Sequence, residues 1–154
     1  MKRQLLLCAV VGWGLACAGV GAAQEKGIWR ASSSTAKSIT GDVTFANGKI
    51  AINYSSGSVI AQIRGLQPSE LSAAFDLDGT PEGSGNLYRL SIPGATRFEH
   101  KNTLCGGEDT QWMVTYAAGR SLQIAFFSGQ TMPVLTGEAM ATATNLCGTF
   151  SYVK

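Results

Sequence analysis

Histidine is nearly absent from this sequence, and charged side chains are few. His100 is the only histidine, and Asp, Glu, Lys and Arg together make up 14% of the 154 residues. One imidazole is too few for the usual zinc sites, which combine several His, Cys or carboxylate ligands. It also leaves any serine or thiolate nucleophile with a single candidate base, and no Gly-x-Ser-x-Gly elbow is present. We therefore expect a protein that is not an enzyme and holds neither a metal nor another cofactor.

Residues 1–23 have the pattern of a secretory signal peptide. Met1-Lys2-Arg3 is basic, the segment from Leu5 to Val20 is apolar and uncharged, and small residues precede Gln24. The apolar run is marginally short for a transmembrane anchor. The sequence therefore predicts a signal peptide at 1–23, a single domain at 24–154 and no membrane span after cleavage.

The predicted signal peptide indicates export, to the periplasm or the extracellular space. Cys17 leaves lipid anchoring open as an alternative, although Gly14 stands where a lipobox carries a large aliphatic residue. Of the 12 Lys and Arg, Lys2 and Arg3 lie in this segment, so that 10 remain against 10 Asp and Glu. A neutral chain without basic runs lacks the electrostatic footprint of a nucleic-acid-binding protein, so nucleic acid is not an expected partner.

Cleavage would leave two cysteines, Cys105 and Cys147. A pair of cysteines in an exported chain is most simply explained by one disulfide. The chain-entropy model gives roughly 4 kcal/mol of stabilisation for a loop of this length. The competing interpretations are a catalytic thiolate and a pair of metal ligands. Both are disfavoured because the sequence offers a single histidine as a base or as a further ligand.

The strongest structural signal lies between Ser38 and Tyr54. Asn47-Gly48 is typical of a two-residue type I′ hairpin turn, which requires positive φ at both positions. With this turn, Phe45 pairs with Ile50, and the neighbouring pairs run out to Gly41 with Tyr54. Every second pair is then apolar, so the turn and the alternation predict the same register and the same buried face.

Alternating apolar rows continue along the chain and predict about eight short strands. We expect inward rows at Val59, Ala61 and Ile63, at Tyr88, Leu90 and Ile92, and a half-buried strand over Ala73–Leu77. A second hairpin is predicted with strands at 112–116 and 122–126 and a four-residue connection at 117–120, a helical turn at 136–141, and a closing strand at 146–153. Short connections favour an all-β fold, a small antiparallel up-and-down β-barrel, with a β-sandwich as the alternative.

Two sets of side chains are candidates for function. The segment from Arg97 to Asp109 concentrates charge, and its candidate partner-binding residues are Arg97, Glu99, His100 and Lys101. If the barrel is not filled, its aromatics would line a cavity for a small apolar ligand; the candidates are Trp29, Tyr54, Tyr88, Trp112, Tyr116 and Phe126. A weak hydrolase using His100 ranks last among the hypotheses.

The closing run Leu146-Cys147-Gly148-Thr149-Phe150-Ser151-Tyr152, with the signal peptide and the cysteine pair, resembles small exported bacterial β-rich proteins of unassigned function. In layout the chain is also similar to lipocalin-type and lysozyme-inhibitor barrels, an analogy of architecture that brings no activity with it. We expect a monomeric binding protein for a protein or cell-envelope partner, with an inhibitor as one form that it could take. A carrier of a small apolar ligand is the alternative.

Overall fold

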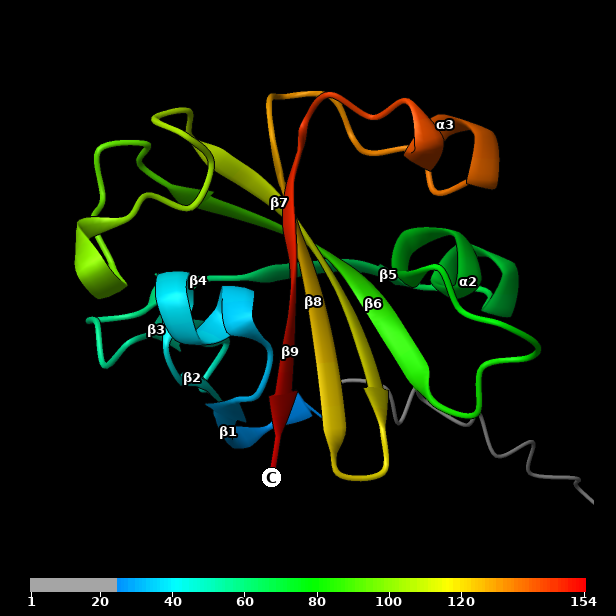
Figure 1. The fold of residues 1–154 in the computed structure, drawn as a ribbon, viewed down its shortest axis with the longest axis horizontal. Helices are drawn as coiled ribbons and strands as arrows, with labels where there is room; N and C mark the ends of the chain where they lie inside the picture. The colour runs from blue at the N-terminus through cyan, green and yellow to red at the C-terminus, as the bar shows by residue number, and fades with distance from the viewer. Residues whose placement is uncertain (1–24) are drawn as a thin grey trace, which may run out of the picture.

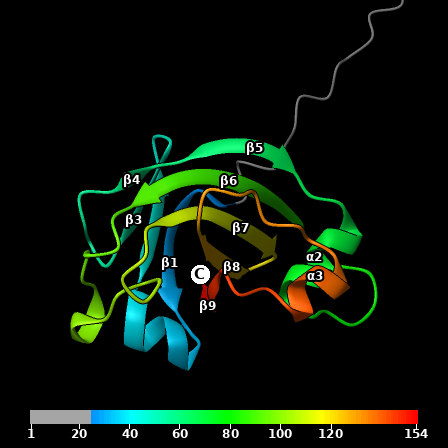
Figure 2. The ribbon, with the colours of Figure 1, turned by 90° about the horizontal axis from the view of Figure 1, so that it is seen from above.

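The computed structural model describes residues 25–154, so the predicted signal peptide lies outside the described residues. Nine antiparallel strands form one sheet in the order β4-β3-β2-β1-β9-β8-β7-β6-β5, which curls into a nearly closed barrel (Figures 1 and 2). The strands are β1 (Gly27–Ala31), β2 (Val43–Ala46), β3 (Lys49–Ile52), β4 (Ser58–Val59), β5 (Ala61–Gly65), β6 (Ser84–Ile92), β7 (Thr110–Ala118), β8 (Ser121–Ser128) and β9 (Leu146–Val153). The all-β, barrel-like expectation is confirmed.

Four short helical segments flank the sheet within the described residues. The regular ones are α2 (Pro68–Phe75) and α3 (Gly137–Ala141), which Figure 1 shows on the same side of the barrel. A π-helical turn, η1 (Ala36–Thr40), joins β1 to β2, and a 3-10 turn, η2 (Glu99–Lys101), lies in the long loop between β6 and β7. Within residues 25–154, no helix is both long enough and apolar enough to cross a membrane.

The β2–β3 hairpin has the predicted register. Val43 pairs with Ile52, Phe45 with Ile50 and Ala46 with Lys49, around a turn in which Asn47 has φ 53° and Gly48 has φ 69°. The expected outermost pair of Gly41 with Tyr54 does not form. Asn53 and Tyr54 both adopt left-handed backbone conformations, which ends the strand and turns the chain away.

One continuous segment closes most of the barrel. β4 pairs with β3 and β5 pairs with β6, and only Ile60 separates them, so a single extended segment passes from one end of the sheet to the other. Ile60 N donates to Gly48 O at 2.9 Å, beside the hairpin turn. Beyond that point β5 has no strand on its second edge. We call the opening between the β2–β3 turn and β5 the seam.

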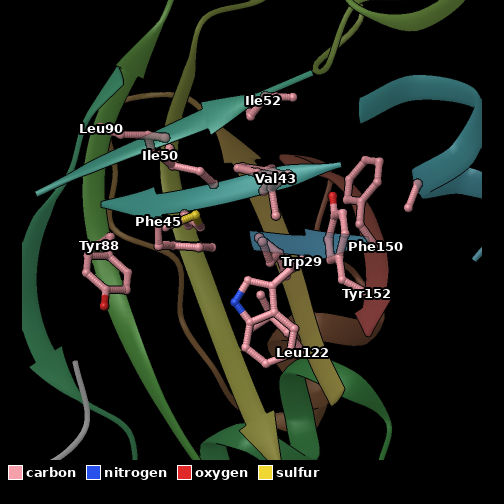
Figure 3. Close-up of a cluster of buried hydrophobic side chains, with 14 of the residues drawn as sticks. Trp29, Val43, Phe45, Ile50, Ile52, Tyr88, Leu90, Leu122, Phe150 and Tyr152 are labelled. Carbon is pink, nitrogen blue, oxygen red and sulfur yellow. The ribbon is translucent and has the colours of Figure 1, made fainter. Parts of the chain in front are cut away.

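Two hydrophobic clusters lie on opposite faces of the sheet. The interior cluster fills the barrel with side chains from β1, β2, β3, β6, β7, β8 and β9 and includes Phe126. Figure 3 shows Trp29, Phe150 and Tyr152 among its members. The outer cluster lies between the β6–β7–β8 face and α2 and includes Leu71, Phe75, Leu87, Val114 and Phe127. The predicted inward row Tyr88, Leu90 and Ile92 belongs to the interior cluster and is confirmed.

The strand expected over Ala73–Leu77 is wrong, because residues 68–75 form α2. Pro68 occupies the first turn, and the Gln67 N–H donates to Glu70 Oε2 at 2.8 Å in a capping box. Leu71, Ala74 and Phe75 then share one buried face of the helix. Phe75 fits an alternating row and a helical stripe equally well, and the capping signals decide between them.

The inward row expected at Val59, Ala61 and Ile63 is also wrong. All three side chains are exposed, whereas Ile60 and Gln62 face a cavity at the seam. Every residue of β5 is exposed, because this end strand has a neighbour on one edge and no core over its outer face.

The C-terminal half follows the sequence prediction more closely. β7 and β8 form the second hairpin, although Ala118 pairs with Ser121, so that the connection is two residues rather than four. The helical turn expected at 136–141 is α3, and the closing strand is β9. The sulfurs of Cys105 and Cys147 lie 2.00 Å apart, which confirms the predicted disulfide between the loop before β7 and the start of β9.

Candidate functional site

The candidate partner-binding residues lie at one end of the barrel, in the loop of residues 93–109. Internal bonds hold this loop: Phe98 N donates to Asn102 O at 2.8 Å, and Gly94 N donates to Asp109 Oδ1 at 2.8 Å. Asn102 Nδ2 donates to Ser38 O at 2.8 Å and so fastens the loop to η1. With the disulfide at Cys105, these contacts make the loop a fixed surface.

The turn of residues 53–57 lies beside this loop. A hollow of about 200 Å³ is lined by the turn on one side and by Pro93, Thr96 and Phe98 on the other. Gly41 lies between the two segments, since a Cβ built there would come within 3.2 Å of both Asn53 Oδ1 and Glu99 Oε1. We call the surface formed by residues 53–57 and 93–109 the loop face; Figures 1 and 2 place it on the side of the barrel away from α2 and α3.

The loop face contains an unusual concentration of left-handed backbone. Asn53 and Tyr54 have φ of 49° and 58°, and His100 and Lys101 have φ of 53° and 62°. For residues other than glycine this conformation costs roughly 1–2 kcal/mol each, less for Asn. Such strain persists where the surrounding structure enforces it, and it concentrates at functional sites. Here it fixes the direction of two adjacent exposed turns.

The structure brings the four candidate partner-binding residues together. Arg97, His100 and Lys101 are exposed, and Glu99 is half-buried against Gly41. Among residues 25–154 one ion pair forms, between Arg64 and Glu70 at 2.7 Å, so within these residues the cations of the loop face form no ion pair.

The six candidate cavity-lining aromatics do not converge on one cavity. Trp29, Tyr88 and Phe126 belong to the interior cluster, whereas Trp112 and Tyr116 belong to the outer cluster. Tyr54 belongs to neither: it is 84% exposed and lies on the loop face. The barrel interior is packed with side chains, and Tyr88 is the member of this set that lines the seam cavity.

A buried carboxyl group at the seam was not predicted from the sequence. Glu25 is 2% exposed, and its oxygens accept hydrogen bonds from Tyr88 Oη, Thr115 Oγ1 and, at 3.0 Å, Asn86 Nδ2. Its backbone carbonyl accepts from Trp29 Nε1 at 2.7 Å, which anchors the residue to the interior cluster. Nothing in the sequence around Glu25 indicates that its side chain is buried.

Burial dominates the electrostatics of this group. Desolvation raises the pKa of Glu25 above its usual value, while the hydrogen bonds from Thr115, Tyr88 and Asn86 act in the opposite direction. The pKa of Tyr88 is raised by burial and by the neighbouring Glu25 carboxylate, so its hydroxyl stays protonated. Within the described residues, no group of three or more His, Cys, Asp or Glu is placed to hold a metal ion.

Comparison with known proteins adds no relative. No protein-family model, curated protein or solved structure matches the chain. The resemblance to small exported β-rich proteins therefore stays a prediction.

Proposed function

We propose that the protein is a non-enzymatic, exported binding protein that docks a protein partner through the loop face. The observation that carries this proposal is the placement of Tyr54, which is 84% exposed and follows Asn53, a residue that lies across Gly41 from Glu99 in the loop of Arg97, His100 and Lys101. Tyrosine and arginine are the side chains most often found at the energetic centres of protein interfaces. A rigid surface also loses little conformational entropy on binding.

Around residues 97–101 the exposed charges of the loop face are cationic, which favours carboxylates on the partner there. Of the three acids of the loop face, Glu99 lies against Gly41, the Asp109 carboxylate accepts the Gly94 N–H, and Glu108 is exposed near the start of β7. Arg97 and Lys101 have no such partner within the described residues. We therefore expect the interface to place Tyr54 near its centre and to pair these two cations with acidic side chains.

The test uses variants of the oxidised protein as affinity baits in an envelope extract from an exporting host. A partner is identified by cross-linking to wild type and then purified for calorimetry. Tyr54→Ala and Arg97→Ala are each expected to weaken its Kd at least tenfold, with the melting temperature unchanged. Val134→Ala is the matched control, since Val134 is also exposed but lies near α3, outside the loop face.

Two results would count against the proposal. In the first, the partner's Kd is unaffected by Tyr54→Ala and Arg97→Ala. In the second, the same variants lower the melting temperature as much as they weaken binding, which would assign these residues to folding rather than recognition.

A further inference from the structure

The seam holds a cavity of about 410 Å³ that the proposed function does not use. Its walls include Phe45 and Ile60, and its floor is formed by Glu25 and Tyr88. Figure 3 shows the Tyr88 ring at the edge of the interior cluster, with its hydroxyl directed away from Phe45 and Leu90. The volume lies within the range of small-molecule sites, which combine apolar walls with a few placed polar groups.

The polar floor is rich in hydrogen-bond acceptors. Gln62 Nε2 donates to Asn86 Oδ1 at 3.0 Å, and Asn86 Nδ2 donates in turn to Glu25 Oε1 at 3.0 Å. These two hydrogen bonds fix the orientation of both side-chain amides. They leave the side-chain amide oxygen of Gln62 without a partner in the described structure. A carboxylate has about four acceptor positions, of which Asn86, Thr115 and Tyr88 occupy three on Glu25.

The rim of the cavity has the opposite charge. Lys26 and Lys49 both line the cavity and are exposed, and neither forms an ion pair within the described chain. An anionic group that pairs with Lys26 or Lys49 would therefore lie at the opening of the cavity, where it remains hydrated. The buried carboxyl would instead attract a cationic group to the floor, where the low dielectric strengthens the interaction.

We propose that the seam cavity binds a small amphipathic amine. Its ammonium group would donate hydrogen bonds to the remaining acceptor position of Glu25 and to the side-chain amide oxygen of Gln62. Its apolar body would contact Phe45 and Ile60. Lys26 and Lys49 would bind an anionic substituent at the opening. A zwitterion with an apolar side chain would therefore contact the polar floor, the apolar walls and the lysines of the rim. This site is independent of the loop face and of any protein partner.

The test compares probes that share one apolar body. Phenethylamine carries only the amine, 3-phenylpropionate only the carboxylate, phenylalanine both, and 2-phenylethanol neither charge; octylamine and octanoate repeat the comparison with an aliphatic body. Binding is measured by calorimetry and by amide chemical-shift changes of the oxidised protein. The amines and phenylalanine are expected to bind at least tenfold more tightly than the matched acids, with shifts at Gln62 and Tyr88.

Variants separate recognition from folding. Glu25→Gln retains the shape of the side chain and should weaken phenethylamine at least tenfold while leaving 2-phenylethanol unchanged. Gln62→Leu, on the exposed strand β5, removes the side-chain amide oxygen but keeps the Glu25 carboxyl group, and it should also weaken the binding of the amines. Lys49→Met should weaken phenylalanine relative to phenethylamine. Equal or tighter binding of the acids, an unchanged phenethylamine Kd in both Glu25→Gln and Gln62→Leu, or no saturable binding of any amine would overturn the proposal.

Discussion

Replacing Glu25 by alanine should lower the free energy of unfolding by about 3 kcal/mol, because a buried donor that loses its acceptor costs about 1–3 kcal/mol. Three donors lose their acceptor in this variant: Asn86 Nδ2, Thr115 Oγ1 and Tyr88 Oη. The total cost for the three donors stays near the lower end of this range because the Thr115 and Tyr88 hydroxyls can rotate toward other acceptors. Thr115 Oγ1 already lies 3.4 Å from Asn86 O. Guanidinium unfolding of the oxidised protein measures the change.

The pH dependence of stability supplies a sharper test of the same group. Because the pKa of Glu25 is raised above its ordinary value of 4.5, the folded protein binds this proton more tightly than the unfolded chain does. The stability that Glu25 contributes is therefore fully present below the unfolded pKa and is lost as the pH rises through the folded pKa. Acidification from neutral pH toward 4.5 should stabilise wild type relative to Glu25→Gln.

The comparison with Glu25→Gln removes the contribution of other carboxyl groups. Glu70, for example, has its pKa lowered by the hydrogen bond from Arg64, and it acts in the opposite direction in both proteins. A difference in unfolding free energy between wild type and Glu25→Gln that stays constant between pH 7 and 4.5 would refute the reasoning. So would a wild type that gains stability over the variant as the pH rises.

Three further predictions concern the scaffold. Replacing Cys105 and Cys147 together by serine should cost about 2–4 kcal/mol, measured by unfolding under identical conditions; a loss below 1 kcal/mol would show that the loop contributes little chain entropy. Gly48→Ala should cost about 1 kcal/mol because φ is 69° there, while Gly137→Ala, with ordinary φ and no atom within 4 Å of the new Cβ, should change stability by less than about 0.5 kcal/mol. Phe126→Ala should cost about 3–5 kcal/mol through the cavity left in the interior cluster, and thermal unfolding that shifts no more than for Gly137→Ala would contradict the packing described.

Elements specified by local signals could be predicted from the sequence, and the β2–β3 hairpin is the clearest case. Its turn at Asn47-Gly48 and its alternation both lie within a few residues and indicate one register. The segment around Phe75 failed because a row of alternating residues and a helical stripe overlap there. The capping box of Gln67 and Glu70 was present in the sequence and would have decided the question.

The candidate sites depend on contacts that no local pattern contains. The three donors to Glu25 lie 61, 63 and 90 residues away along the chain, so its burial follows only from the closed sheet. Tyr54 joins the loop face for the same reason, because the neighbouring segments at Asn53 and Glu99 meet only across Gly41. By contrast, Arg97, Glu99, His100 and Lys101 lie together because they are neighbours in sequence.

The position of β9 in the sheet bears on how the chain folds as it is made. β9 is the last strand in sequence, yet it lies in the middle of the sheet order, between β1 and β8. Thr40 and Tyr152, whose hydroxyls lie 2.7 Å apart, are separated by 112 residues. Until β9 emerges from the ribosome, only the extended β4–β5 segment connects the β1–β4 and β5–β8 halves, and loop closure over this distance slows folding. A nascent chain that lacks β9 should therefore remain protease-sensitive.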